Sequence, residues 1–227
     1  MKTAAAKISY FANKATVSNG TYYDSGVIYS VKNGQQTKIM SADDIKLPGE
    51  HNMLNYMAAF AAVEGLVDYE TCKKVAMEFA GVEHRLEHVR TLRGVEYIND
   101  SIASSPTRTA AGLHALKTKP IVIAGGYDKH IPFEGLGDEL CQYAKAVFLT
   151  GDTAEKIKSA IEASQYFAGS GLAVSLNDDF EETVRAASKF AQEGDIVILS
   201  PACASFDRFK NFAERGKYFK KIVMELE

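Results

Sequence analysis

The chain lacks several features that would assign it to a broad class of protein. Its 227 residues include no apolar run of the roughly 18–20 residues that a membrane-spanning helix needs. The N-terminal MKTAAAKISYF is a poor signal peptide, because its short alanine run soon turns polar. A net charge of −3 argues against a broad basic surface for nucleic acid. We therefore expect a cytoplasmic protein that binds neither membranes nor nucleic acids.

Cysteine is scarce as well. Cys72, Cys141 and Cys203 are odd in number and far apart, so they suggest neither a disulfide framework nor a zinc site and fit a reducing cytoplasm. A phosphate loop of the GxxxxGK[ST] type, an internal repeat and a low-complexity tract are also absent from the sequence. Hydrophobic residues make up 46% of the chain, which is enough for a sizeable core.

The first third of the chain predicts a small antiparallel sheet followed by helices. Strand-like runs occupy residues 7–40, and Asn19-Gly20 and Asn33-Gly34 have the composition of hairpin turns, whose central positions need positive φ. Helical periodicity follows at 51–65 and 69–80. A small meander is marginal by itself. We therefore expect the helices to cover it, or a larger domain to include it.

From residue 95 strands and helices alternate. Nearly continuous Val/Ile/Leu runs predict strands at 95–99, 120–125, 146–150, 172–176 and 195–200. The segments between and after them predict helices near 106–117, 134–144, 153–164, 179–192 and 207–226. This order is typical of an α/β fold, a Rossmann-like, mainly parallel sheet with helices on both faces.

Sheets of this kind bind ligands beyond the carboxyl ends of their strands. We therefore expect function in the loops that follow the strands, at 99–105, 125–130, 150–153, 177–179 and 200–206. The change from meander to alternating pattern places a domain boundary between residues 81 and 82.

Two segments before this region carry candidate polar residues. Asn52 and Asn55 lie three apart at a predicted helix start, and their amides could read an adenine edge. The alternative is that Asn52 caps the helix and Asn55 is solvated. His84 and Arg85, in EHRLE, could meet a phosphate or an acidic intermediate. The alternative there is an ordinary surface charge cluster.

Two further segments follow predicted strands. In NDSIASSPTRT, Asp100 could accept hydrogen bonds from a ribose, and Pro106 as first helical residue, capped by Ser104 or Ser105, would form an anion site. The alternative is a polar turn with a good cap. In AGGYDKH, the glycine pair permits close backbone approach, and Lys129 supplies a point charge for a carboxylate or phosphate.

The most informative segment is SPACASFDRFKNFAERGKYF, residues 200–219. Its small residues leave backbone N–H groups open to a substrate carboxylate, and Ser205 adds a hydroxyl. Cys203 invites a nucleophile interpretation, but the sequence identifies no base for it. Arg215 could be a surface helix charge or a ligand arginine. The aromatic residues suit a core better than a ligand contact: Phe209, Phe212 and Phe219.

These five segments, in this order, resemble the muramyl ligase family, in its branch that adds D-glutamate. SPACASFDRFKNFAERG is the most specific, and together they span residues 49–219. The resemblance implies an enzyme of three domains that bind the UDP group, ATP and the incoming amino acid. It implies that residues 1–81 are the C-terminal part of the central ATP-binding domain and 82–227 the amino-acid-binding ligase domain. The N-terminal domain and most of the central domain would then be missing.

The resemblance also implies a reaction. An ATP-dependent ligase of this branch joins D-glutamate to UDP-N-acetylmuramoyl-L-alanine through an acyl phosphate, in the peptidoglycan synthesis that supports cell-wall biogenesis, cell shape and division. ATP and Mg²⁺ are the implied cofactors. The family's magnesium ligands have no counterpart here, so we expect no metal site in this chain and no activity of this chain alone.

Roles carry over to matching positions. For the nucleotide, the resemblance implies Asn52 and Asn55 near the adenine, with Arg85 and Asp100 reaching ATP and Asp100 at the ribose. His84 matches an active-site histidine. Arg215 matches a motif arginine whose role stays open between structure and catalysis.

For D-glutamate, the resemblance implies a site formed by Ser104, Lys129, Ser205, Phe206 and Phe212. Ser104 replaces a threonine hydroxyl of the family pattern. Ile102 stands where a lysine is common, so one positive charge near the substrate is missing. Two alternatives remain open. One is another amino-acid-adding ligase, including one that adds glutamate to folate. The other is a non-catalytic, small-molecule-binding α/β module.

Overall fold

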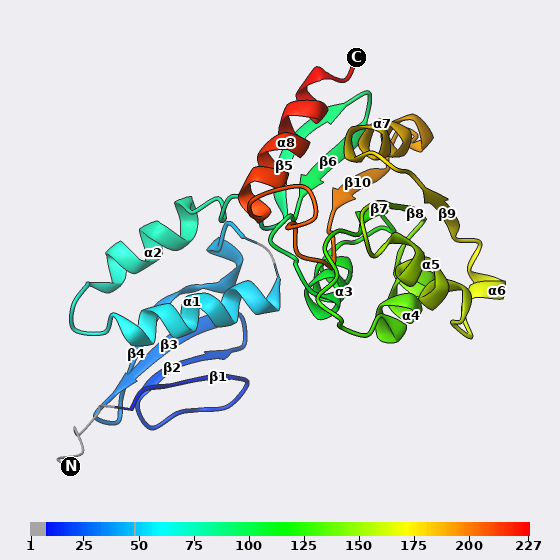
Figure 1. Ribbon diagram of the computed structural model, residues 1–227. Coiled ribbons are helices and arrows are strands. Elements are labelled where there is room, and N and C mark those ends of the chain that lie inside the picture. Colours follow the sequence, from blue (N-terminus) through cyan, green and yellow to red (C-terminus); the bar gives the residue numbers. More distant parts are fainter. Residues whose placement is uncertain (1–7, 48) are drawn as a thin grey trace, which may run out of the picture. The chain divides into compact units, whose positions relative to one another are not determined.

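The computed structural model describes residues 8–47 and 49–227 (Figure 1). The chain forms two compact units that divide between Gly81 and Val82, and each unit is described by itself. Within the described residues, the helices are too short or too polar to cross a lipid bilayer.

The first unit is a four-stranded sheet with two α-helices. Its elements are β1 (Tyr10–Asn13), β2 (Gly20–Asp24), β3 (Val27–Lys32), β4 (Gln35–Ser41), the 3₁₀ helix η1 (Ala42–Asp44), α1 (Glu50–Ala62) and α2 (Tyr69–Glu78). The strands are ordered β1-β2-β3-β4. Helices α1 and α2 lie over the sheet, and one apolar cluster that includes Met40, Met57 and Phe60 fills the space between (Figure 1). The helices therefore cover the sheet as expected.

The predicted all-antiparallel meander is wrong at its first strand. Strand β1 runs parallel to β2, whereas the β2–β3 and β3–β4 pairs are antiparallel. Gly20 has φ 127°, and a Cβ there would lie 1.9 Å from the carbonyl oxygen of Tyr10. Gly20 is thus required by the close approach of two strands and not by a hairpin turn. The predicted strand region 7–40 begins at Lys7, which lies outside the described residues.

Two other dipeptides make the hairpin turns of this unit. Asn33 and Gly34, with φ of 52° and 77°, join β3 to β4 as predicted. The turn between β2 and β3 is formed by Ser25 and Gly26, with φ of 49° and 84°, and was not predicted. Each pair has positive φ at both central positions, which matches the twist of the flanking strands.

The second unit is built on a six-stranded sheet. Its strands are β5 (Glu87–Leu92), β6 (Val95–Asn99), β7 (Ile121–Ala124), β8 (Ala146–Leu149), β9 (Ala173–Leu176) and β10 (Ile196–Leu199), in the order β5-β6-β10-β7-β8-β9. Five strands are parallel, and β5 pairs antiparallel with β6 at one edge. The mainly parallel α/β sheet is therefore confirmed.

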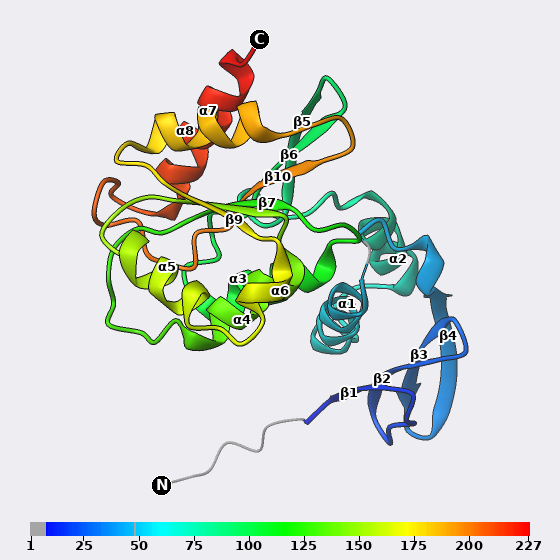
Figure 2. The same ribbon diagram turned by 90° about the vertical axis from the view of Figure 1, so that its right-hand side faces the viewer.

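Helices cover both faces of this sheet. They are α3 (Pro106–Ala115), α4 (Glu134–Tyr143), α5 (Ala154–Glu162), the short α6 (Phe167–Ser170), α7 (Phe180–Phe190) and α8 (Phe212–Glu225). Figure 2 shows α7 and α8 on one side of the sheet and α3, α4 and α5 on the other. The last helix begins at Phe212 and not near 207, because Asn211 caps it by accepting a hydrogen bond from the N–H of Glu214.

Alternate residues of each central strand enter opposite cores, as the period of two requires. On β7, Val122 packs in the cluster with α4 and α5, whereas Ile121 and Ile123 pack in the cluster with α7 and α8. Full burial of each such side chain stabilises the fold by about 1.5–3 kcal/mol. Because both faces are buried, polar chemistry is left to the loops at the strand ends, and sheets of this kind bind ligands at the carboxyl ends.

Gly216 of α8 sets a tight contact beneath these loops. A Cβ at this position would lie 2.3 Å from Nδ1 of His84 and 3.1 Å from Nδ2 of Asn99. We predict that Gly216→Ala lowers the free energy of unfolding by about 2 kcal/mol, because this overlap outweighs a helix-propensity gain of up to about 1 kcal/mol.

Gly135→Ala in α4 is the matched control, because no atom lies within 4 Å of a Cβ there. It should stabilise the protein by about 0.5–1 kcal/mol in the same urea denaturation series. Equal responses of the two variants would contradict the packing argument.

Candidate active-site loops

A buried arginine joins the loops that follow β6 and β10. Arg215 of α8 is 2% exposed, and its Nε donates to Oγ of Ser101 at 3.1 Å. Its Nη2 donates to the carbonyl oxygens of Ser101 and Cys203, both at 3.0 Å, and its Nη1 to that of Ala204 at 3.1 Å. Burial lowers the pKa of Arg215 to about 10, so the guanidinium stays charged at neutral pH. One side chain thus fixes two loops.

The loop after β7 packs against the same β10 loop. The N–H of Gly125 donates to the carbonyl oxygen of Pro201 at 2.8 Å, and that of Tyr127 to Ala204 at 3.0 Å. A Cβ on Gly126 would lie 2.4 Å from the carbonyl oxygen of Ala204. The glycine pair therefore serves the close approach of one loop to another.

The loops after β8 and β9 are joined to the segment that precedes α8. Nη1 of Arg208 donates to Oγ1 of Thr150 at 2.9 Å, and Nη2 donates to the carbonyl oxygen of Asp178. Together with the Arg215 contacts and the bonds between the β7 and β10 loops, these bonds connect the segments after all five parallel strands. The predicted functional loops therefore form one continuous surface at a single edge of the sheet.

Asp100 lies inside this edge. The carboxylate is 4% exposed; Oδ1 accepts from the N–H of Leu86 at 3.2 Å and Oδ2 from Oγ of Ser200 at 3.0 Å. Burial raises the pKa of Asp100 to about 6, against the lowering effect of these hydrogen bonds and of Arg85 and Arg108. The ribose role of Asp100 stays a prediction, and in this structure the carboxylate holds β6, β10 and residue 86 together.

His84 is also buried, with 3% exposure. Its Nδ1 lies 2.8 Å from Nδ2 of Asn99, and its ring meets Phe212 edge-on at 5.9 Å between centroids. Its Nε2 has no hydrogen-bond partner among the described residues. Burial lowers the pKa of His84, and the neighbouring Glu83 and Glu87 oppose that shift. The histidine is therefore part of a packed polar cluster and not of a surface charge cluster; Arg85 beside it is exposed.

The predicted D-glutamate residues lie on three adjacent loops. Ser104 precedes α3, Lys129 follows β7, and Ser205 and Phe206 follow β10, where strands β6, β10 and β7 are neighbours. Ser205 is buried, Lys129 is exposed, and the 62%-exposed Phe206 contacts Tyr127 edge-on. Phe212 begins α8, beside His84.

Cys203 is not an activated nucleophile. Its Sγ is buried and lies 3.1 Å from Oγ1 of Thr153. Burial raises the pKa of the thiol to about 11, which leaves it protonated at neutral pH. At the start of α3, Pro106 is the first helical residue as predicted and Ser105 is the N-cap residue, although its side chain makes no capping hydrogen bond.

In the first unit, Asn52 and Asn55 lie in the first two turns of α1. The N-cap residue is Gly49, so the alternative that Asn52 caps this helix is wrong. The N–H of Asn52 bonds to the carbonyl oxygen of Gly49 at 3.1 Å, and Asn55 is exposed. A hollow of about 440 Å³ lies at the same helix start, lined by Gly49, Glu50 and Met53 among others.

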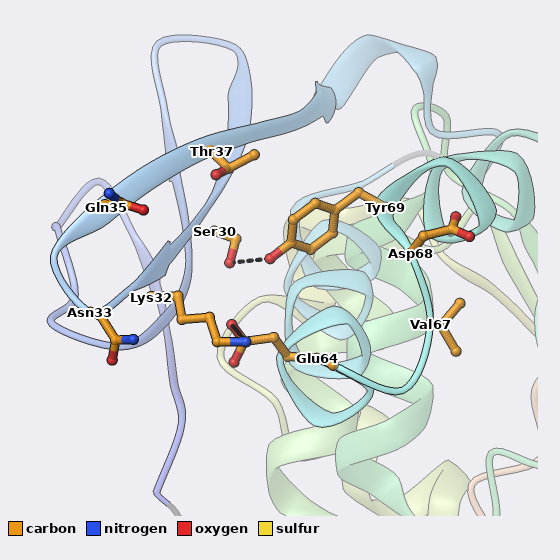
Figure 3. Close-up of a pocket in the computed structure, with 10 residues that line it drawn as sticks. Ser30, Lys32, Asn33, Gln35, Thr37, Glu64, Val67, Asp68 and Tyr69 are labelled. Carbon is orange, nitrogen blue, oxygen red and sulfur yellow. Dashed lines mark hydrogen bonds and ion pairs between the residues drawn. The ribbon is translucent and has the colours of Figure 1, made fainter.

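A second hollow of the first unit, of about 390 Å³, lies between the β3–β4 hairpin and the segment joining α1 to α2 (Figure 3). Its polar side chains already contact one another: the Tyr69 hydroxyl donates to Oγ of Ser30 at 2.7 Å, and Lys32 lies 4.0 Å from Glu64. The predicted nucleotide residues do not line it. We assign no ligand to this hollow.

One group of side chains among the described residues has the spacing of metal ligands, Glu83, His84 and Glu87. A cation already lies there, because Nζ of Lys220 is 2.7 Å from Glu83 and 2.8 Å from Glu87. Magnesium prefers oxygen ligands in an octahedral arrangement that this set does not offer. The group does not fit the implied magnesium ion.

Sequence reasoning missed several residues of this edge. Asn99 and Ser101 flank the predicted Asp100, and Glu87 and Lys220 balance the charges around His84. Asn99 and Ser101 could have been found from their place at a strand end, where ligand-facing loops begin. Lys220 carries no local signal, because its partners are 133 and 137 residues away in the chain.

The fold and these loops define an α/β domain with a polar surface at the carboxyl end of its parallel strands, and the comparisons with known proteins place it in a family. The family model "Mur ligase, glutamate ligase domain" matches residues 84–203. The chain therefore belongs to the Mur ligase family.

Curated relatives are similar over almost the whole chain. UDP-N-acetylmuramoylalanine–D-glutamate ligase of Clostridium beijerinckii is 48% identical over 226 residues, which are 100% of this chain and 48% of the relative. The protein of that name from Clostridium acetobutylicum is 51% identical over 219 residues, 96% of this chain and 46% of the relative. The chain thus spans about half the length of the relatives that it matches.

Solved structures share the fold at low sequence identity. A pseudomurein peptide ligase type C from Methanothermus fervidus has a TM-score of 0.63 at 16% identity, covering 91% of this chain and 41% of that one. A bifunctional folylpolyglutamate synthase/dihydrofolate synthase from Yersinia pestis has a TM-score of 0.62 at 14% identity, covering 91% and 46%. At these identities the likeness concerns the fold alone.

Arg215→Lys tests whether the loops depend on the guanidinium. A lysine has one nitrogen and cannot reach Ser101, Cys203 and Ala204 together, so buried carbonyl groups lose their donors at about 1–3 kcal/mol each. We predict a loss of about 3 kcal/mol in the free energy of unfolding, measured by urea denaturation. Arg185→Lys, in an exposed pair with Glu181, should change it by less than about 0.5 kcal/mol. A comparable effect of both variants would refute the role of Arg215.

Asp100→Asn tests the raised pKa of the buried carboxyl. The folded state binds the proton more tightly than the unfolded chain, so Asp100 stabilises the fold below pH 4 and loses this contribution as pH rises through about 6. We predict that the free energy of unfolding of the variant minus that of the parent is about 2–3 kcal/mol larger at pH 7 than at pH 4.

The comparison uses urea denaturation at several pH values, with Asp178→Asn at an exposed position as control. A difference between Asp100→Asn and the parent that stays constant with pH would show that Asp100 is ionised at no cost in the fold.

Proposed function

We propose that this chain is the C-terminal half of an ATP-dependent ligase that adds D-glutamate to UDP-N-acetylmuramoyl-L-alanine. Relatives that carry the name of this reaction match 96–100% of the chain at 46–51% identity, which supports this substrate over the other amino acids and over folate. The reaction belongs to peptidoglycan synthesis. We assign it to the cytoplasm, in keeping with the three free, buried cysteines.

The observation that carries the proposal is the contact between the β7 and β10 loops. A hydrogen bond of 3.0 Å joins the N–H of Tyr127 to the carbonyl oxygen of Ala204. Tyr127 is two residues before Lys129 in the sequence, and Ala204 is one residue before Ser205. Lys129 is exposed, and the adjacent Asp128 is paired with Lys156 and His130. An amino acid with two carboxylates is therefore offered a cationic side chain beside a loop of small residues whose N–H groups can bind carboxylates.

Arg215, Gly125 and Gly126 act on this site through the backbone. They hold the two loops in one arrangement before any ligand arrives, so little conformational entropy is lost on binding. In the proposed reaction, positioning the amine of D-glutamate against an activated carboxyl group supplies most of the rate advantage of this domain. Phe206, which contacts Tyr127, and Phe212, which contacts His84, flank the loops.

ATP would supply the phosphoryl group that turns the substrate carboxylate into an acyl phosphate with a good leaving group. We propose nucleotide-binding roles for Asn52 and Asn55 in the first unit, and separately for Arg85 and Asp100 in the second unit. The exposed Asn55 and Arg85 are accessible to a nucleotide, whereas the buried Asp100 needs the backbone around Leu86 to shift before a ribose can reach it. Residues beyond this chain would bind the magnesium ion.

Titration of the 227-residue chain with D-glutamate tests the proposal. We predict weak, saturable binding, measured by calorimetry or by amide chemical shifts in the β7 and β10 loops. Lys129→Ala should lower the affinity at least tenfold, since one charge-assisted hydrogen bond contributes about 1.5–3 kcal/mol. Lys119→Ala is the matched control, because Lys119 is an exposed lysine at the opposite end of β7.

L-Glutamate and L-lysine serve as ligand controls and should bind more weakly. Absence of D-glutamate binding, or equal affinity of the Lys129→Ala and Lys119→Ala variants, would count against the site. Preference for another amino acid would favour a different amino-acid-adding ligase.

A further inference from the structure

The polar cluster around His84 contains an amide whose orientation is fixed from both ends. The Asn99 side chain accepts the N–H of Ser101 at 3.2 Å through Oδ1 and donates to Oε2 of Glu87 at 2.9 Å through Nδ2. Rotating the amide by 180° would set an oxygen against the Glu87 carboxylate and an NH₂ group against the Ser101 N–H. The Nδ2 group must therefore face Glu87.

The same Nδ2 group also faces the imidazole ring of His84. Its second hydrogen points to Nδ1, 2.8 Å away, so Nδ1 must present a lone pair. The ring has little freedom to avoid this contact, because it lies against Gly216 and meets Phe212 edge-on. The backbone of His84 adds to the constraint with a φ of 68°, a left-handed conformation that is uncommon for a residue with a Cβ.

We propose that Asn99 is a positioning residue that fixes His84 as the neutral imidazole protonated at Nε2. A ring that accepts a hydrogen bond at Nδ1 and is neutral carries its one proton on Nε2. A proton on Nδ1 would point at the Asn99 NH₂ group, with two donors facing each other. Asn99 thus selects both the tautomer and the neutral state.

The charges around the ring are consistent with a neutral imidazole. Glu83 and Glu87 would favour the imidazolium, but both carboxylates bond to Nζ of Lys220, and Lys217 adds a further positive charge nearby. The second oxygen of Glu87 is already used by the N–H of His84 and by Asn99. The negative charges of Glu83 and Glu87 are therefore balanced by lysines, which reduces their effect on the imidazole ring.

The assignment determines what His84 can do. Nε2 is buried, lacks a hydrogen-bond partner among the described residues, and lies 3.7 Å from the nearest oxygen of Glu83. As an N–H group it donates, and it cannot take a proton. Resting on the proposed function, His84 would therefore donate to an oxygen of the bound reactants and would not serve as the base for the amine.

Nitrogen NMR of the ¹⁵N-labelled 227-residue chain tests this assignment directly. At neutral pH the His84 ring should show an unprotonated Nδ1 and a protonated Nε2, and a coupling across the hydrogen bond should join Nδ1 to Nδ2 of Asn99. The signals are assigned by their loss in His84→Gln. A protonated Nδ1 in the parent protein would overturn the proposal without any variant.

Asn99→Asp tests whether Asn99 is the cause. The aspartate replaces a donor by an acceptor of the same shape, so a proton should appear on Nδ1 and the pKa of His84 should rise. Asn177→Asp, at the end of β9 and bonded to Ser175, is the matched control and should leave the His84 signals unchanged. A folded Asn99→Asp protein, judged by its amide spectrum, whose Nδ1 stays unprotonated at neutral pH would refute the role of Asn99.

These measurements need no ligand. A protein that shows the predicted tautomer but binds no D-glutamate would retain the positioning role and contradict the proposed function. The opposite result would retain the function and remove the positioning role.

Discussion

The buried guanidinium of Arg215 is the interaction on which the carboxyl edge of the sheet depends. Its donors bond to Ser101, Cys203 and Ala204, so the loops after β6 and β10 are fixed by one side chain from α8. The β7 loop is in turn bonded to the β10 loop. Burying a cation is costly unless its hydrogen bonds are satisfied. Here the Ser101 hydroxyl and backbone oxygens of two loops satisfy them, and the same bonds fix the geometry of the loops.

The same edge buries a second polar network with the opposite sign. Asp100 accepts hydrogen bonds from Leu86 and Ser200. It also packs closely against Gly112 of α3, where an added Cβ would lie 3.1 Å from Oδ2 of Asp100. Its pKa of about 6 indicates that the carboxylate is held at a cost in free energy. Packed, partly strained polar networks of this kind are a common feature of functional sites, and here the network joins strands β6 and β10 to helix α3.

The sequence predicted what periodicity determines. Continuous Val/Ile/Leu runs identified the five parallel strands, and the strand-end rule located Asp100, Lys129 and Ser205 on neighbouring loops. It failed where tertiary contacts decide. Gly20 is needed because another strand approaches closely, and not because of a turn. Edge strand β5 was not predicted, because its alternation of apolar and polar residues is weak. Lys220 bonds to partners more than 130 residues away in the chain. The roles of Asn52 and Arg85 remain predictions.

The last segment is the most distinctive in the sequence because helix α8 serves the site and the core at once. Arg215 fixes two loops, Gly216 leaves room for His84, and Lys220 balances Glu83 and Glu87. On the inner side of the same helix Phe219, Ile222 and Val223 fill the core against the sheet. The side chain at each of these positions is constrained by a different physical contact. A helix that made no contacts with neighbouring loops would need neither an arginine nor a glycine at these positions. The contacts of Arg215 and Gly216 therefore explain why this pair occurs where α8 meets the active-site loops.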